Sequence, residues 1–253
     1  MSDTVHVDRP APHVMRLTID RPPVNAIDSA AQRRLAEALA GAETDLDVRV
    51  VILTGAGAHF CAGADLREEQ AIERDEVDGF LVGIGVVLHR IRHHRVPVVA
   101  AVNGPAHGGG LELALSCDIR IGGQAAAFGA AGVNVGLVAN FRLLAQTIGE
   151  ARARHLLLTG WTCRAEQALD WSLLTELVDD PGDRALAVAE RIASRAPLSV
   201  ETTKSCLNRS PDLDERAATE LQATSFAELF RTSDHAEALT AFFEKRPGVY
   251  RRA

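Results

Sequence analysis

The stretch NGPAHGGGLELALSCD, from Asn103 to Asp118, contains the strongest fold signal of the chain. Its three consecutive glycines, Gly108 to Gly110, lead directly into an apolar segment with one carboxylate, Glu112. Glycine makes tight turns and lets a backbone approach a ligand closely. The stretch therefore has three interpretations: a phosphate cradle, a plain tight turn, or a place where backbone N–H groups meet a developing anion.

A second glycine-rich stretch, LTGAGAHFCAGADL at residues 53–66, helps to choose between these interpretations. Neither stretch has the Gly-x-Gly-x-x-Gly or Gly-x-x-x-x-Gly-Lys-Ser/Thr spacing that cradles phosphates. Each one follows a short apolar run, residues 48–55 and 97–104, which predicts a strand buried on both faces. Two such strands could bring two backbone N–H groups to one point, next to the positive end of a helix. The pair indicates an oxyanion hole.

The rest of the first two thirds of the chain has the pattern of an α/β protein. Met15, Leu17 and Ile19 alternate with polar residues, which predicts a half-buried strand. A helix is expected to begin near Ser29, with Gln32 completing a capping box. A further amphipathic helix is expected over residues 79–95, followed by a short strand at DIRIGG.

The last third of the chain is helical in pattern. We expect a core over residues 1–195 and a helical C-terminal region over residues 196–253. Several apolar residues of this region exceed what a short helical hairpin can bury, and two interpretations stay open: packing against the core, or a subunit interface. These residues are Leu221, Phe226, Leu229, Phe230, Phe242 and Phe243.

Composition narrows the class of protein. The chain has 253 residues, of which 47% are hydrophobic and 24% charged, as in an ordinary globular protein. The net charge of −7, without a concentrated basic stripe, disfavours nucleic acid as a partner. The four cysteines have no metal-ligand or disulfide spacing. We therefore expect no metal site. No signal peptide or membrane segment is predicted, so we expect a cytoplasmic protein.

Three segments together resemble the enoyl-CoA hydratase/isomerase (crotonase) family: VRVVILTGAGAHFCAGADLRE, VPVVAAVNGPAHGGGLELALSCDIRIGGQAAAFG and AFFEKRPGVY. The similarity covers nearly the whole chain. It implies an α/β fold, a spiral of ββα units with a helical C-terminal region that forms trimers or dimers of trimers. It also implies an acyl-CoA substrate, with no cofactor besides the CoA that the substrate carries.

The resemblance also implies roles for individual residues. Ala64 and Gly109 would supply the two N–H donors of the oxyanion hole, and Glu112 would be the general acid/base. Glu112 and Asp65 also have simpler interpretations as helix-capping residues, and Asn25 could be a turn residue. The residues implied in substrate binding are Asn25, Ala62, Asp65, Leu66, Gly108, Gly132, Asn140 and Phe141.

One departure from the family pattern bears on the reaction. Hydratases of the family have a second catalytic glutamate in a Phe-Gly-x-Pro-Glu motif, where this chain has Gly132. The following loop is shorter, and Asn140 and Phe141 are expected to reshape the wall of the site. We predict an enoyl-CoA hydratase-type lyase. The alternatives are another one-carboxylate reaction of the family (decarboxylation, hydrolysis or isomerisation of an acyl-CoA) and a non-catalytic acyl-CoA binder.

Overall fold

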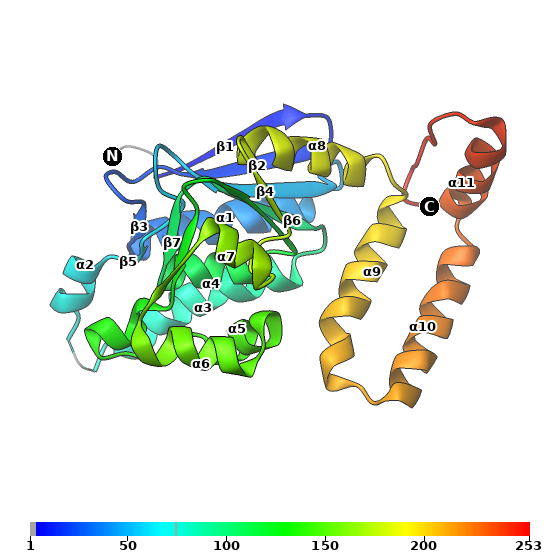
Figure 1. Cartoon of the computed structure of the whole chain (residues 1–253). Helices are drawn as coiled ribbons and strands as arrows, with labels where there is room; N and C mark the ends of the chain where they lie inside the picture. Colours follow the sequence, from blue (N-terminus) through cyan, green and yellow to red (C-terminus); the bar gives the residue numbers. More distant parts are fainter. Residues whose placement is uncertain (1–3, 74) are drawn as a thin grey trace.

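The protein is described by a computed structural model that covers residues 4–73 and 75–253. Its largest element is a six-stranded sheet in the order β1-β2-β4-β6-β8-β11, in which β1 is antiparallel to β2 and all other neighbours are parallel (Figure 1). The strands are β1 (Val5–Ala11), β2 (Val14–Ile19), β4 (Val50–Gly55), β6 (Val98–Val102), β8 (Ile119–Gly123) and β11 (Glu176–Val178). In register, Thr54 of β4 lies opposite Ala101 of β6. The chain therefore leaves these two strands side by side, at the same edge of the sheet.

A second layer of short strands lies beside the large sheet. β3 pairs with β5, and β9 lies between β7 and β10. Their bounds are β3 (Ala26–Ile27), β5 (Gly63–Ala64), β7 (Pro105–His107), β9 (Ala127–Gly129) and β10 (Thr162–Arg164).

The chain alternates regularly between these layers. Strands β2, β4, β6 and β8 of the large sheet are each followed by one short strand and then by helix. The helices are α1 (Ser29–Thr44), α2 (Leu66–Ala71), α3 (Val77–His93), α4 (Gly109–Ser116), the 3-10 turn η1 (Ala131–Val135), α5 (Phe141–Ile148) and α6 (Glu150–Thr159). This repetition is the predicted ββα spiral, and the α/β fold class is confirmed.

Helices cover both faces of the large sheet. On one face, α8 (Pro181–Ala193) packs its alanines Ala185, Ala189 and Ala193 against a cluster that includes Val50 and Val99. The other face is buried against α1, α3, α4, α7 (Ala165–Asp170) and the short strands in a larger cluster. The predicted buried strands are thus buried on both faces, which explains their continuous apolar runs.

The predicted capping box is wrong, although α1 does begin at Ser29. Asp28 is the N-cap, and its side chain accepts a 2.8 Å hydrogen bond from the N–H of Ala31. Aspartate one residue earlier provides the capping oxygen, which leaves Gln32 without a capping role. Its side chain is 4% exposed and its oxygen lies against Gly83 of α3.

The C-terminal helices lie to one side of the core in Figure 1. They are α9 (Pro197–Arg209), the 3-10 turn η2 (Ser210–Asp212), α10 (Glu215–Phe230) and α11 (Ser233–Glu244), so the predicted boundary after residue 195 falls between α8 and α9. The side chain of Lys204 on α9 forms a 2.7 Å ion pair with Asp118 of the core.

Packing against the core is the wrong interpretation for the four phenylalanines of the C-terminal region. Phe226, Phe230, Phe242 and Phe243 are 59–77% exposed in the single chain. Their place in a subunit interface stays a prediction.

Candidate functional site

The two glycine-rich stretches lie next to each other after they leave β4 and β6. Cys61 and Ala106 form a parallel bridge between them, and the N–H of His107 donates a 3.0 Å hydrogen bond to the carbonyl oxygen of Cys61. A Cβ atom on Gly110 would lie 2.0 Å from that same oxygen. Only glycine fits there, so the spacing of the glycines allows the two backbones to touch. We call residues 61–64 and 106–112 the floor of the site.

The floor brings the backbone of Ala64 close to that of Gly109. Gly63 has φ +96°, and a Cβ atom on it would lie 2.8 Å from the nitrogen of Gly109. A Cβ atom on Gly109 would in turn lie 3.7 Å from the nitrogen of Ala64. Gly109 is the first residue of α4, so its N–H has no acceptor within its own helix. Two backbone N–H groups so placed can bind an oxygen that gains negative charge.

Glu112 lies in the first turn of α4, between the buried residues Leu111 and Leu113. Its Oε1 accepts a 2.7 Å hydrogen bond from the backbone N–H of Asn140. Burial raises the pKa of the Glu112 carboxyl above its ordinary value, and the hydrogen bond from Asn140 offsets part of this shift. A carboxylate with a raised pKa is a better proton acceptor, as a general base must be.

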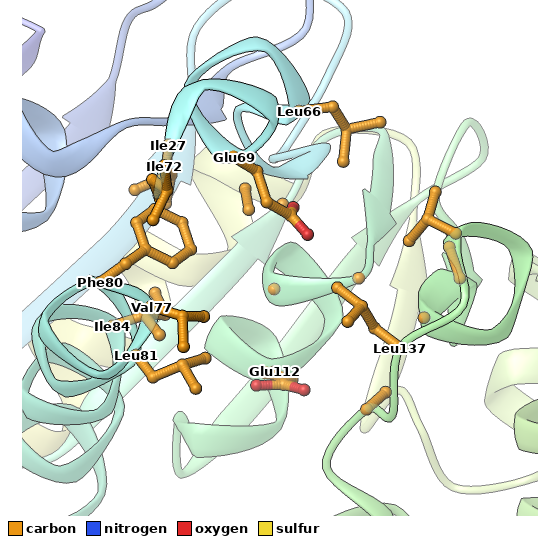
Figure 2. A pocket seen from close by; sticks show the side chains of 18 of the residues that line it. Ile27, Leu66, Glu69, Ile72, Val77, Phe80, Leu81, Ile84, Glu112 and Leu137 are labelled. Carbon is orange, nitrogen blue, oxygen red and sulfur yellow. The ribbon is translucent and has the colours of Figure 1, made fainter. Parts of the chain in front are cut away.

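The floor lies in a cavity of about 540 Å³, into which Figure 2 shows the Glu112 side chain reaching. Helices α2 and α3 line one side. Part of the segment 131–141, which we call the wall, lines another side with residues between Ala131 and Ala139. Seven of the sequence-predicted site residues line this cavity: Ala62, Ala64, Leu66, Gly108, Gly109, Glu112 and Gly132.

Asn25 and Asp65 are placed outside the cavity lining. The amide of Asn25 is 2% exposed and donates 2.9 and 2.7 Å hydrogen bonds to the carbonyl oxygens of Ala56 and His59. Asp65 caps α2 through a 2.9 Å bond from the N–H of Arg67, and its other oxygen lies 2.5 Å from the guanidinium of Arg21. The hydrogen bond from Arg21 holds the pKa of the Asp65 carboxyl below its ordinary value. Both side chains fix loops around the floor, and their contact with substrate stays a prediction.

Asn140 and Phe141 belong to the wall but do not line the main cavity. Asn140 is the N-cap of α5, where its side chain accepts a 3.2 Å bond from the N–H of Leu143. It reaches the site through its backbone N–H, which bonds to Glu112. Phe141 is 64% exposed and lines a neighbouring hollow with Leu158 instead. Its predicted contact with substrate is untested.

Gly132 lies in η1, close to the backbone of residues 137–139 of the wall. A Cβ atom there would lie 2.9 Å from the carbonyl oxygen of Leu137 and 3.1 Å from the nitrogen of Ala139. These are backbone atoms, which cannot move aside as the end of a flexible side chain can. The wall therefore has no room for a glutamate at residue 132 in its present conformation.

Several cavity residues were missed in the sequence. The periodicity over residues 79–95 predicts the helix but does not show which of its apolar residues face a cavity rather than the core; Phe80, Leu81 and Ile84 face it. Gln32 fits a capping motif in the sequence but lines the cavity instead. Glu69 of α2 also lines it, and only its position one helical turn after the Asp65 cap could have indicated this.

The described part of the chain contains neither a metal-ligand cluster nor a membrane-spanning helix. No three His, Cys, Asp or Glu side chains gather there in a group that could hold a metal ion. None of the helices described is both long and apolar enough to cross a bilayer.

The chain is similar to proteins that are named as hydratases of CoA thioesters. The sequence profile of the family described as Enoyl-CoA hydratase/isomerase matches residues 11–252. A short-chain-enoyl-CoA hydratase of Clostridium acetobutylicum is 37% identical over 91% of both chains. An (E)-benzylidenesuccinyl-CoA hydratase of Thauera aromatica is 36% identical over 95% of this chain and 96% of its own. The crystal structure of an enoyl-CoA hydratase from Bacillus anthracis superposes with a TM-score of 0.96 at 31% identity, covering 99% of this chain and 100% of that one.

Proposed function

The chain belongs to the enoyl-CoA hydratase/isomerase family, and from this premise we propose that it is an enoyl-CoA hydratase-type lyase that adds water to a 2-enoyl thioester. The observation that carries this proposal is the floor, where the backbones of Ala64 and Gly109 and the side chain of Glu112 meet in one cavity.

The two backbone N–H groups stabilise the charge that the reaction creates. When the oxygen of water bonds to C3, the C2=C3 electrons move toward the thioester carbonyl, whose oxygen becomes negative. The N–H groups of Ala64 and Gly109 donate to that oxygen. Because a rigid backbone holds them, they need no reorganisation as the charge develops. Removing one such donor typically costs about 3–4 kcal/mol of transition-state stabilisation.

Glu112 moves the proton. Its carboxylate takes a proton from the attacking water, and the resulting acid returns one to C2 of the enolate. The products are then a 3-hydroxyacyl thioester and an unchanged glutamate. The raised pKa of Glu112 favours the first step, since a stronger base accepts the proton more readily.

A second group of functions is favoured by Gly132. Residue 132 is a glycine with the backbone of Leu137 and Ala139 close against it, so the wall supplies no second carboxylate at this position. Reactions that need one carboxylate fit this feature: decarboxylation, hydrolysis or isomerisation of an acyl-CoA. A non-catalytic acyl-CoA binder fits it as well.

The experiment is to mix the protein with crotonyl-CoA and with a longer 2-enoyl-CoA and to follow the loss of enoyl absorbance. We expect turnover that Glu112→Gln lowers by about 10²–10⁴-fold while acyl-CoA binding measured by calorimetry is kept. Glu150→Gln, at an exposed residue of helix α6, is the matched control. Tight acyl-CoA binding without loss of absorbance would contradict hydration and favour the second group of functions.

The assembly and the setting of the enzyme are part of the same proposal. We propose a homotrimer or a dimer of trimers formed through the helical C-terminal region, which the exposure of Phe226, Phe230, Phe242 and Phe243 supports. We also propose a cytoplasmic location and no cofactor besides the CoA of the substrate. Light scattering on the full chain tests the assembly: a monomer at micromolar concentration would contradict it.

A further inference from the structure

A carboxylate with no part in the proposed reaction reaches into the cavity. Figure 2 shows Glu69 extending from α2 among the apolar side chains of Leu66, Ile72 and Phe80. The same figure shows Glu69 well apart from Glu112, which comes from α4. Glu69 and Glu112 therefore belong to different parts of the cavity, and Glu73, which also lines it, is exposed.

Glu69 has no polar partner among the described residues. Its side chain is half-buried, and no hydrogen bond or ion pair reaches it from that part of the chain. The preceding Glu68 differs, since its Oε2 accepts a 2.8 Å bond from the N–H of Ser29. The described residues that line the cavity include no lysine, arginine or histidine. Beyond the described residues, the Glu69 carboxylate is left to water or a ligand as its partner.

The chemistry of the ligand follows from the lack of a polar partner for Glu69 among the described residues. A plain alkyl chain that filled the cavity would strip water from Glu69 and leave a carboxylate without a hydrogen bond, which is costly. A hydroxyl or amino group on the chain would replace that water with a hydrogen bond to a charged acceptor. Sites built to bond such a donor reject the analogue that lacks it.

We propose that Glu69 determines acyl-chain specificity: it selects thioesters whose chain bears a hydrogen-bond donor, a hydroxyl or amino group, over the plain alkyl chain of the same length. Around this polar contact, Leu66, Ile72 and Phe80 bury the methylene groups of the chain. The inference rests on the proposed function, since it takes an acyl-CoA to be the ligand.

The test compares matched substrates. The 2-enoyl-CoA thioesters of four to eight carbons are each assayed with and without a terminal hydroxyl, and then with a terminal amino group. At the best length the wild type is expected to prefer the donor-bearing chain by at least about tenfold in kcat/KM. Glu69→Leu should bring this ratio to one or below. Glu69→Gln, which keeps an accepting oxygen, should retain part of the preference for the hydroxyl but not for the amino group.

The matched control is Gln70→Leu. Gln70 is exposed on the same helix and lies outside the cavity lining, so its variant should keep the wild-type ratio. Because each ratio compares two substrates on one protein sample, a partly folded variant does not distort it.

Three results would overturn the proposal: a wild-type ratio near one at every length, a wild-type preference that survives Glu69→Leu, or an equal loss on all substrates in both Glu69 variants, which would place Glu69 in the chemistry. If the wild type turns over no enoyl-CoA, the proposed function fails separately. Calorimetry with hexanoyl-CoA and 6-hydroxyhexanoyl-CoA then decides. Tighter binding of the hydroxylated chain, lost in Glu69→Leu, supports the proposal; equal binding, or no binding of either, overturns it.

Discussion

The floor and the wall of the cavity differ in how tightly their backbones are constrained. In the floor, residues 61–64 and 106–112 are buried or half-buried, and glycines are required where the two strands touch. In the wall, residues 133–138 are exposed. The floor can therefore bind the part common to all thioesters, whereas the wall is free to vary with the reaction or substrate.

The largest effect that separates the two regions is expected from a pair of glycine variants. In Gly63→Ala the new Cβ meets backbone atoms of the floor, at 2.8 Å from both the nitrogen of Gly109 and the carbonyl oxygen of His107. Both N–H donors must shift, so we expect kcat with crotonyl-CoA to fall about 10²–10³-fold.

Gly136→Ala is the matched change in the wall. Gly136 has φ +78°, but a Cβ there has nothing within 4 Å. The variant should lose only about 1–2 kcal/mol of unfolding free energy from the left-handed backbone, with kcat changed by less than a few fold. Equal losses of kcat in the two variants would contradict the claim that the floor is more tightly constrained than the wall.

The next effect concerns Glu112, on which the two regions act in opposite directions. Burial in the floor raises the pKa of its carboxyl, and the N–H of Asn140 in the wall lowers it. If burial dominates, kcat/KM should fall about tenfold per pH unit below a midpoint above the ordinary glutamate value. A pH profile with an ordinary glutamate midpoint would contradict the raised pKa and show that the hydrogen bond from the wall cancels the effect of burial.

The same shift predicts the pH dependence of stability. Because the folded state binds this proton more tightly than the unfolded state, the contribution of Glu112 to stability is fully present below the ordinary glutamate pKa and is lost as pH rises through the raised one. Glu112→Gln should therefore unfold at a higher temperature than the wild type at pH 7. This gain should disappear near pH 4. A gain that is independent of pH would contradict the shift.

A smaller effect is expected in the wall itself. Gly132→Glu places a side chain against the backbone of Leu137 and Ala139, so it should cost about 1–3 kcal/mol of stability and leave hydration unimproved. Val133→Glu, at a neighbouring residue that is 43% exposed, is the control and should be tolerated. Faster hydration by Gly132→Glu at an unchanged melting temperature would show that the wall readily accepts a second carboxylate.

The smallest effect comes from the helix cap that connects the wall to the floor. Asn140→Ala removes the cap of α5 and should cost about 1 kcal/mol of unfolding free energy, as should Asp28→Ala at the cap of α1. Only the Asn140 variant should also change kcat, by a few fold, because the N–H of Asn140 orients Glu112. Identical kcat values for both variants would show that the cap of α5 does not influence Glu112.

The sequence predicts the floor well because backbone sterics specify it. At Gly110 no other residue fits against Cys61, so the glycine spacing reports the contact directly. The apolar runs of β4 and β6 likewise follow from burial on both faces. The family, the ββα spiral and the hydratase-type activity are implied by the resemblance of these same segments to the crotonase family.

The wall and the sides of the cavity could not be predicted in the same way. Whether Phe80 of α3 faces the core or a cavity depends on how the helices are placed, which periodicity does not encode. Gln32 fits a capping motif locally, but Asp28 provides a competing cap. Phe242 and Phe243 are apolar, yet no surface of the described part of the single chain buries them. Each of these outcomes depends on tertiary context rather than on local pattern.

The most direct test of the floor is a crystal structure of the protein with acetoacetyl-CoA, whose thioester oxygen carries enolate character. The distances to measure are those from this oxygen to the backbone nitrogens of Ala64 and Gly109. We predict that both are about 2.7–3.1 Å, with the Glu112 carboxylate facing C2 and C3 of the ligand. A thioester oxygen that bonds to neither nitrogen would contradict the proposal that the two glycine-rich stretches meet to bind a developing anion.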